Sequence, residues 1–277
     1  FISATHLRPA NFIEKKIEED RKDFFEWTNT MMFNQDPEMA AGKEASELAS
    51  LNVITYAMQL AEKHKTNPQK DIIGALLDGH GGVEGLNEDE FVWFFLLLIA
   101  AGNESTRTVT SHGMRLLMEH PDQLQYLVDN PDKIPNACEE MLRYNTAFIL
   151  MRRQCVEDTE VGGKLIKKGD KIILHYHTVN HDESIFGDDA MEFDVTRPER
   201  MPDMYNQHRA FGIGQHFCLG THLARLEVRV MFEEIIPRLR NPKLVGELGY
   251  TRSNLVNGIK RMPITFDPEL KRSNAAA

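Results

Sequence analysis

The sequence lacks a long hydrophobic run. Its longest apolar stretch, residues 91–101, has eleven members, whereas a helix needs about 20 to cross a bilayer. We therefore expect no membrane span, and we interpret this stretch as part of a buried helix. Residues 1–30 carry charges throughout and lack the apolar segment of a secretory signal.

Cysteine is scarce as well. The three cysteines are odd in number and show no paired spacing, so we expect no disulfide framework and predict a cytoplasmic protein. The sequence also has no Gly-x-Gly-x-x-Gly fingerprint of a dinucleotide site and no four-cysteine spacing of an iron–sulfur cluster. Any electrons that the chemistry of this chain consumes must therefore come from another protein.

Positive charge is in deficit. The 32 lysines and arginines stand against 42 acidic residues, which gives a net charge of −10, and an acidic chain repels phosphate backbones. We therefore expect no nucleic-acid partner. The hydrophobic fraction of 42% and the charged fraction of 27% are ordinary for a soluble globular protein. We predict a single domain over residues 1–277, with residues 1–13 assigned to no element.

The periodicity of apolar residues predicts a mainly α fold with small β elements. Asn87 precedes three acidic residues and an apolar run, which is typical of a helix start. We expect helices over 14–64 with a break near 34–37, and over 71–77, 88–120, 121–129, 134–144 and 222–239. We expect a strand–turn–strand over 160–174, a polar loop over 198–208 and a strand over 261–266.

The most informative segment is Phe211-Gly-Ile-Gly-Gln-His-Phe-Cys-Leu-Gly220. A cysteine thiolate can ligate haem iron and donate electron density that favours O–O cleavage. The glycines let the backbone turn tightly around Cys218, and a helix that starts just after it would lower the pKa of the thiol. Taken without its spacing, such a segment is more often a buried structural cysteine in a tight turn.

Three motifs together carry a family resemblance. The segment 211–220 resembles the haem loop of cytochrome P450s, Phe-x-x-Gly-x-x-x-Cys-x-Gly, at every fixed position. Glu140-Met-Leu-Arg143 resembles the family's Glu-x-x-Arg helix, and Ala101-Gly-Asn-Glu-Ser-Thr106 resembles its oxygen-activating segment, Ala-Gly-x-Glu-Thr-Thr. Alone, the second pattern is usually a surface ion pair, and the third fits a glycine kink beside a surface acid.

The resemblance runs from about residue 19 to residue 266 and lacks the family's N-terminal third. It is greatest to bacterial enzymes that hydroxylate sterols, branched fatty acids or other methyl-branched lipids, or terpenoids. Asn103 and the segment Leu255-Val-Asn-Gly-Ile carry that finer likeness.

The resemblance implies a cytochrome P450 fold and haem b, with Cys218 as the metal ligand. It places further residues around the haem: Ala101, Arg153, Phe211, Gly212, His216 and Gly220. It implies that Glu140 and Arg143 form a buried pair that supports the haem loop.

The resemblance also implies catalytic and substrate-binding residues. Glu104, Ser105 and Thr106 would serve proton delivery and oxygen activation, with Ser105 where relatives usually have threonine. The residues expected to line an apolar substrate pocket are Phe148, Ile149, Leu150 and Val256.

The function that follows is a monooxygenase that inserts one oxygen atom from O2 into a C–H bond of an apolar small molecule. Its electrons would come from a ferredoxin-type protein with an NAD(P)H-dependent reductase, docked near Cys218 on basic residues such as Arg209, Arg225 and Arg229. The alternative is a non-catalytic haem-binding fragment or a truncated gene product. A peroxide-using member is disfavoured because Glu104 and Ser105 keep the acid–alcohol pair.

A metal site at the histidines of segment 175–181 is a further alternative, since residues two apart share a strand face. No cysteine or acid completes its ligand set, so we favour a structural strand and turn.

Overall fold

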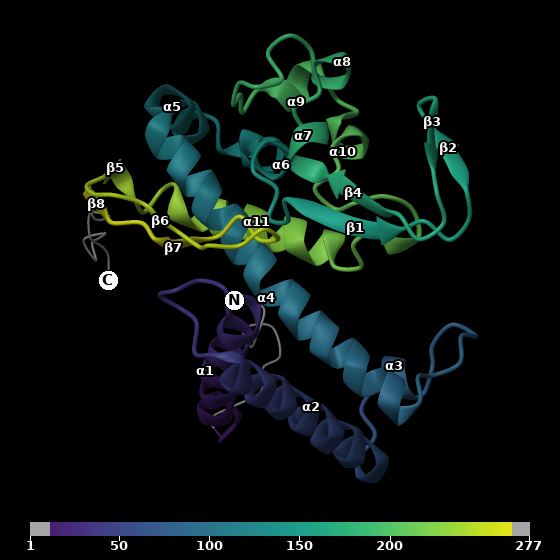
Figure 1. The fold of residues 1–277 in the computed structure, drawn as a ribbon. Helices are drawn as coiled ribbons and strands as arrows, with labels where there is room; N and C mark the ends of the chain where they lie inside the picture. The colour runs from purple at the N-terminus through teal and green to yellow at the C-terminus, as the bar shows by residue number, and fades with distance from the viewer. Residues whose placement is uncertain (1–11, 268–277) are drawn as a thin grey trace, which may run out of the picture. The chain divides into compact units, whose positions relative to one another are not determined.

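The computed structural model describes residues 12–267, with side chains from residue 20 onward (Figure 1). Residues 1–11, most of the segment to which the sequence assigned no element, lie outside the described residues. The chain divides into two compact units, one up to Glu104 and one from Ser105. Both are helical, with small sheets in the second unit alone among the described residues, and the predicted fold class is confirmed.

The first unit is an assembly of helices. It contains α1 (Phe12–Met32), α2 (Lys43–Thr66), α3 (Ile72–Leu77) and the first half of α4 (Glu88–Glu119). The break between α1 and α2 includes the predicted 34–37 segment. Aromatic rings fill the space between these helices, and the Phe24 and Tyr56 rings meet edge to face at 4.9 Å.

The start of α4 is fixed by its own side chains. Asn87 Oδ1 accepts the Glu90 backbone N–H at 3.0 Å, and Glu90 Oε2 accepts the Asn87 N–H at 3.0 Å. This reciprocal pair satisfies two donors that a helix start leaves unbonded. The expected N-cap is therefore correct.

The second unit is built around three long helices. They are the second half of α4, α6 (Ile134–Tyr144) and α11 (Thr221–Ile235). Shorter helices complete it: α5 (Pro121–Asp129), η1 (Pro131–Lys133), α7 (Tyr176–Val179), α8 (Glu183–Phe186), α9 (Arg197–Arg200), α10 (Met204–Gln207) and η2 (Gly214–His216).

A glycine brings the three long helices of the second unit together. A Cβ added at Gly113 on α4 would lie 2.6 Å from the Phe232 ring on α11 and 2.7 Å from the Met141 sulfur on α6. Phe232 and Met141 are both buried in the main core of this unit. Only a residue without a side chain permits this approach.

The sheets are small antiparallel pairs in the second unit. They are β1 (Leu150–Gln154) with β4 (Lys171–His175), β2 (Thr159–Val161) with β3 (Lys164–Ile166), β5 (Arg240–Leu244) with β8 (Ile264–Asp267), and β6 (Gly249–Tyr250) with β7 (Ile259–Arg261). The predicted strand–turn–strand is present as the β2–β3 hairpin, but β4 pairs with β1 instead of extending it.

Three boundary predictions were wrong. The helix expected over 222–239 ends at Ile235 because Pro237 lacks a backbone N–H and restricts the residue before it. The strand expected over 261–266 is two strands of different sheets, separated at Pro263. The loop expected over 198–208 contains the single-turn helices α9 and α10.

Within residues 12–267, no helix has both the length and the hydrophobicity that crossing a bilayer requires.

Candidate functional site

Cys218 lies in a short loop between η2 and α11. Its backbone N–H donates to the Phe211 carbonyl at 2.9 Å and so closes the loop. Gly212 and Gly214 have φ angles of +73° and +72°, in the left-handed region that glycine adopts without strain. These two glycines therefore let the segment fold back and present one cysteine at the start of a helix.

The Cys218 sulfur is the most accessible of the three. Cys218 is half-buried, whereas Cys138 and Cys155 are buried, and the Cys155 thiol donates to the Glu157 carbonyl at 2.8 Å. Burial raises the pKa of the Cys218 thiol, while the Gly220 N–H and the Arg225 guanidinium lower it. The net shift is upward, contrary to the expected effect of the helix start, because the loss of hydration outweighs both favourable contacts.

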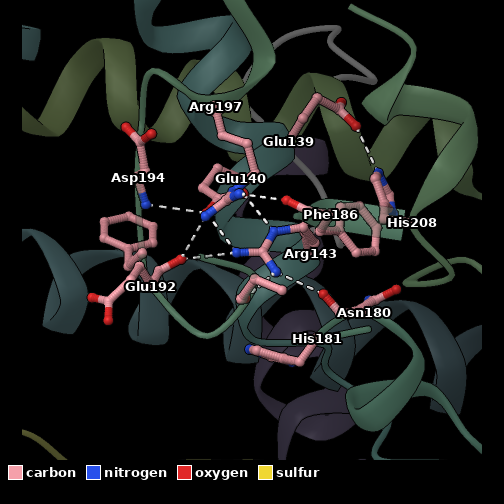
Figure 2. Close-up of polar contacts among 12 residues, drawn as sticks. Glu139, Glu140, Arg143, Asn180, His181, Phe186, Glu192, Asp194, Arg197 and His208 are labelled. Atoms are coloured by element: carbon pink, nitrogen blue, oxygen red, sulfur yellow. Dashed lines mark hydrogen bonds and ion pairs between the residues drawn. The ribbon is translucent and has the colours of Figure 1, made fainter. Parts of the chain in front are cut away.

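The Glu140–Arg143 pair is fully buried and bidentate (Figure 2). Arg143 donates from Nε and NH2 to the two Glu140 oxygens, each at 2.7 Å. A second guanidinium, that of Arg197 on α9, reaches Glu140 Oε1 through Nε at 3.2 Å. Sequence reasoning missed Arg197, because a loop arginine beside other charges shows no periodicity that marks it as buried.

Asn180 connects this ion cluster to the cysteine loop. Its carbonyl accepts from Arg143 NH1 at 2.6 Å (Figure 2), and its side-chain oxygen accepts the Arg209 backbone N–H at 2.6 Å. Asn180 has no exposed surface. The segment before Phe211 is therefore held by a hydrogen-bond chain that begins at Glu140.

The segment 101–106 lies in the middle of α4, where the division between the two units falls after Glu104. Glu104 is 5% exposed and Ser105 is half-buried. Thr106 is buried, and its hydroxyl has no hydrogen-bond partner among the described residues. Within the first unit, the Asn103 amide donates to Thr28 on α1.

The four expected substrate residues lie on two adjacent segments. Phe148 pairs with Val256 in a β-bridge, and Ile149 N–H donates to the Leu255 carbonyl at 2.9 Å. Phe148, Ile149 and Leu150 are half-buried, but Val256 is only 2% exposed. The structure thus brings the two segments together and places Val256 within the packed protein.

A buried histidine fastens these segments to α4. His112 Nε2 lies 2.7 Å from the Asn257 carbonyl, and the Asn257 amide donates to Asn145 Oδ1 at 3.2 Å. Burial lowers the pKa of His112 to about 4, so the ring is neutral near pH 7 and donates from Nε2.

Two histidines of the 175–181 segment pack against each other. The His177 and His181 rings are 4.4 Å apart, and His181 Nδ1 lies 2.8 Å from the His177 carbonyl. Burial lowers the pKa of both. No group of three or more histidines, cysteines or acids in the described part of the chain is arranged to hold a metal ion.

Residues 11–242 match the sequence profile of the family described as "Cytochrome P450". The chain belongs to the cytochrome P450 family. The cofactor of this family is haem, whose iron is ligated by a cysteine thiolate.

Among similar P450s, the steroid C26-monooxygenase of Mycolicibacterium smegmatis is 34% identical over 94% of this chain and 58% of its own length. The linalool 8-monooxygenase of Pseudomonas putida is 34% identical over 89% of this chain and 59% of its own. The solved structure of Mycobacterium marinum cytochrome P450 CYP268A2 in complex with pseudoionone aligns with a TM-score of 0.81 at 32% identity, covering 90% of this chain and 59% of that one. The chain thus spans less than three-fifths of the length of each.

The residues around Cys218 fit the P450 haem. The half-buried sulfur faces one backbone N–H and one guanidinium that favour its thiolate form. Ile213, Phe217 and Leu219 expose half or more of their side chains beside it, and a large apolar ring system would cover such surface. Gly220 places no side chain beside the sulfur. A Cβ added at this position would lie 4.0 Å from it.

The other residues that the sequence assigned to the haem differ in their exposure. His216 is exposed on η2, and Arg153 is half-buried on β1, where its NH1 donates to the Arg152 carbonyl at 3.1 Å. Phe211 packs on the core of the second unit. Ala101 is half-buried on α4 in the first unit.

Two of the three arginines that the sequence suggested for docking an electron donor are bonded to other groups of this chain. Arg225 is 12% exposed and pairs with Glu139, which contradicts its role as a free surface cation. Arg209 NH1 donates to the backbone carbonyls of residues 206, 207 and 208. Arg229 is 45% exposed and pairs with Glu233 one turn along α11.

Proposed function

We propose that this chain carries the haem-thiolate centre of a monooxygenase, with Cys218 as the iron ligand. The observation that supports this most directly is the Cys218 loop. It presents the one half-buried cysteine sulfur at a helix start and is tied through Asn180 to the buried Glu140–Arg143 pair. When bound, haem supplies the iron at which O2 is activated and one oxygen atom is transferred to a C–H bond.

The chain's own residues hold the cofactor and the substrate. Arg153 and His216 offer cationic or hydrogen-bonding partners to the anionic propionates. Phe148, Ile149 and Leu150 are half-buried apolar residues on one segment, which suits a steroid, a branched fatty acid or a terpenoid. The matched steroid and linalool monooxygenases support this substrate class.

The residues that we assign to proton delivery lie on α4. Glu104 is an acid in a dry setting and can pass a proton inward from solvent, and Ser105 beside it can donate a hydrogen bond from its hydroxyl. The electrons come from a separate ferredoxin-type donor with its NAD(P)H reductase, since the sequence contains no dinucleotide or iron–sulfur fingerprint of its own. The cytoplasmic location stays a prediction.

The test is the spectrum of the reduced protein with CO. We expect the strongly red-shifted Soret band of a thiolate-ligated haem, its loss in Cys218→Ala, and its retention in the matched control Cys138→Ala. A normal band in Cys218→Ala would refute the ligand assignment. A normal wild-type band without any turnover of steroid, branched fatty acid or terpenoid substrates would favour the non-catalytic haem-binding alternative.

A further inference from the structure

Glu139 and Glu140 are neighbours on α6, but their carboxylates serve different clusters (Figure 2). Glu140 binds Arg143 and Arg197, as described above. Glu139 Oε2 instead lies 2.9 Å from His208 Nε2, and its two oxygens accept from Arg225 Nε at 2.7 Å and NH2 at 3.0 Å. Glu139 thus forms a second cluster, with one partner before the cysteine loop in the sequence and one after it.

Arg225 in this cluster is held flat between aromatic rings. Its guanidinium lies 3.7 Å from the Tyr205 ring centroid and 4.5 Å from that of Phe211. NH1 donates to the Thr221 hydroxyl at 2.5 Å, at the first residue of α11. With 12% exposure, the cation is largely removed from water, and the Glu139 carboxylate is the counter-charge in direct contact with it.

The same cluster fixes the backbone that closes the cysteine loop. The Ala210 N–H donates to His208 Nδ1 at 3.3 Å, and the other ring nitrogen, Nε2, contacts Glu139. Phe211, the next residue, accepts the Cys218 N–H. The contact between Glu139 and His208 is therefore three residues away from the carbonyl that positions the cysteine.

The Arg225 charge also acts on the cysteine through space. Its guanidinium contacts Phe211 and Thr221, and both of these residues bond to the backbone of Cys218: Phe211 accepts the Cys218 N–H, and the Thr221 N–H donates to the Cys218 carbonyl at 3.4 Å. The cation therefore lies beside the loop that carries the sulfur, where it favours negative charge. Glu139 opposes this influence, because an ion pair at 2.7 Å presents almost no net charge to its surroundings.

We propose that Glu139 is a positioning residue that balances the Arg225 charge beside the cysteine loop and thereby sets how easily the haem iron is reduced. The inference rests on the proposed haem-thiolate function. Reduction adds one negative charge to the centre, so an unbalanced cation nearby favours the reduced form and an unbalanced carboxylate disfavours it.

The test measures the midpoint potential of the purified haem protein. We expect Glu139→Gln to favour reduction at least tenfold in equilibrium constant, about 59 mV for one electron. Arg225→Gln, which leaves the carboxylate unbalanced, should shift the potential in the opposite direction. The double variant Glu139→Gln/Arg225→Gln should return towards wild type. The matched control is Glu234→Gln, on the same helix as Arg225, which breaks an exposed pair with Arg238 and should leave the midpoint potential unchanged.

A purely structural role for Glu139 predicts different results. The single variants would then unfold at lower urea without opposite shifts in potential, and the double variant would restore neither property, which would overturn the inference. If Glu139→Gln does not fold, the midpoint potential of Arg225→Gln decides alone. A rise in that potential, or no change in it, rejects the proposal. Loss of the thiolate band in wild type would instead reject the proposed function, so the two failures are distinct.

Discussion

Arg197 and Glu140 are 57 residues apart in sequence, yet both are fully buried and joined at 3.2 Å. Since Arg143 binds the same carboxylate, one acid carries two desolvated guanidinium groups. The cluster therefore depends on Glu140 more than on either arginine.

Replacing Glu140 by Gln should be severely destabilising. Removing one partner of a buried ion pair costs about 3–5 kcal/mol, because it leaves an uncompensated buried charge. We expect little soluble haem protein and a large fall in the urea midpoint. Glu234→Gln, which breaks a surface pair, should change the free energy of unfolding by less than about 1 kcal/mol. Equal effects of the two variants would contradict the central role of Glu140.

Gly113→Ala should strain the junction of α4, α6 and α11. The new methyl group would lie 2.6 Å from Phe232 and 2.7 Å from the Met141 sulfur, and overpacking a core typically costs about 1–3 kcal/mol. Thermal unfolding measures the loss. The double variant Gly113→Ala/Phe232→Leu should recover part of it, and no recovery would mean that the methyl group is accommodated elsewhere.

His112 should contribute to acid sensitivity. Its pKa is near 4 in the folded protein and about 6.5 in an unfolded chain, so the unfolded chain binds the proton more readily. Stability from this group is complete above pH 6.5 and is lost as the pH falls towards 4, with a slope of up to about 1.4 kcal/mol per pH unit. We expect the stability difference between wild type and His112→Gln to shrink over this window. A constant difference would show that His112 is not a buried neutral group.

Leu150 and Val256 should respond differently to a large substitution. Leu150 is half-buried beside Phe148, so Leu150→Trp should fold, bind haem and weaken the spin-state shift produced by large apolar ligands. Val256 is 2% exposed, so Val256→Trp should lower stability and haem content first. Unchanged binding of every apolar ligand by Leu150→Trp would remove this segment from the substrate pocket.

Substitutions at positions 104–106 of α4 should distinguish residues that deliver protons from a residue that only packs. Glu104→Gln should slow turnover by about 100-fold or more with an intact haem spectrum, and Ser105→Ala should divert electrons to hydrogen peroxide. Thr106→Val should leave coupling unchanged and stability equal or higher, because it removes a buried hydroxyl that has no partner in the described protein. Product formed per NADH consumed distinguishes the three, and unchanged coupling in both Glu104→Gln and Ser105→Ala would exclude this pair.

Much of the helical fold could be predicted because its signals are local. Pro121 and Asn87 mark helix starts, and residues 121–129 and 134–144 form helices with the predicted bounds. The pairing of β4 with β1 was missed, because a periodicity of two residues does not identify the partner strand.

The same distinction between local and long-range signals applies to the candidate site. The glycine spacing around Cys218 and the i,i+3 spacing of Glu140 and Arg143 can be read from the sequence. The contacts of Arg197, Glu139 and His112 join positions 57, 86 and 145 residues apart. No local sequence pattern predicts contacts between positions so far apart. The burial of Val256 and Arg225 depends on such long-range contacts as well.

The spacing of the two acids on α6 also orders assembly on the ribosome. The Glu140–Arg143 pair forms within a single helix, but Arg197 is synthesised 57 residues after Glu140 and Arg225 is synthesised 86 residues after Glu139. A nascent chain therefore exposes two acids of α6 that still lack their distant partners until Arg197 and Arg225 have been synthesised. Because Arg225 follows Cys218 in the sequence, the Glu139 cluster beside the cysteine loop is completed only after the loop itself has been synthesised.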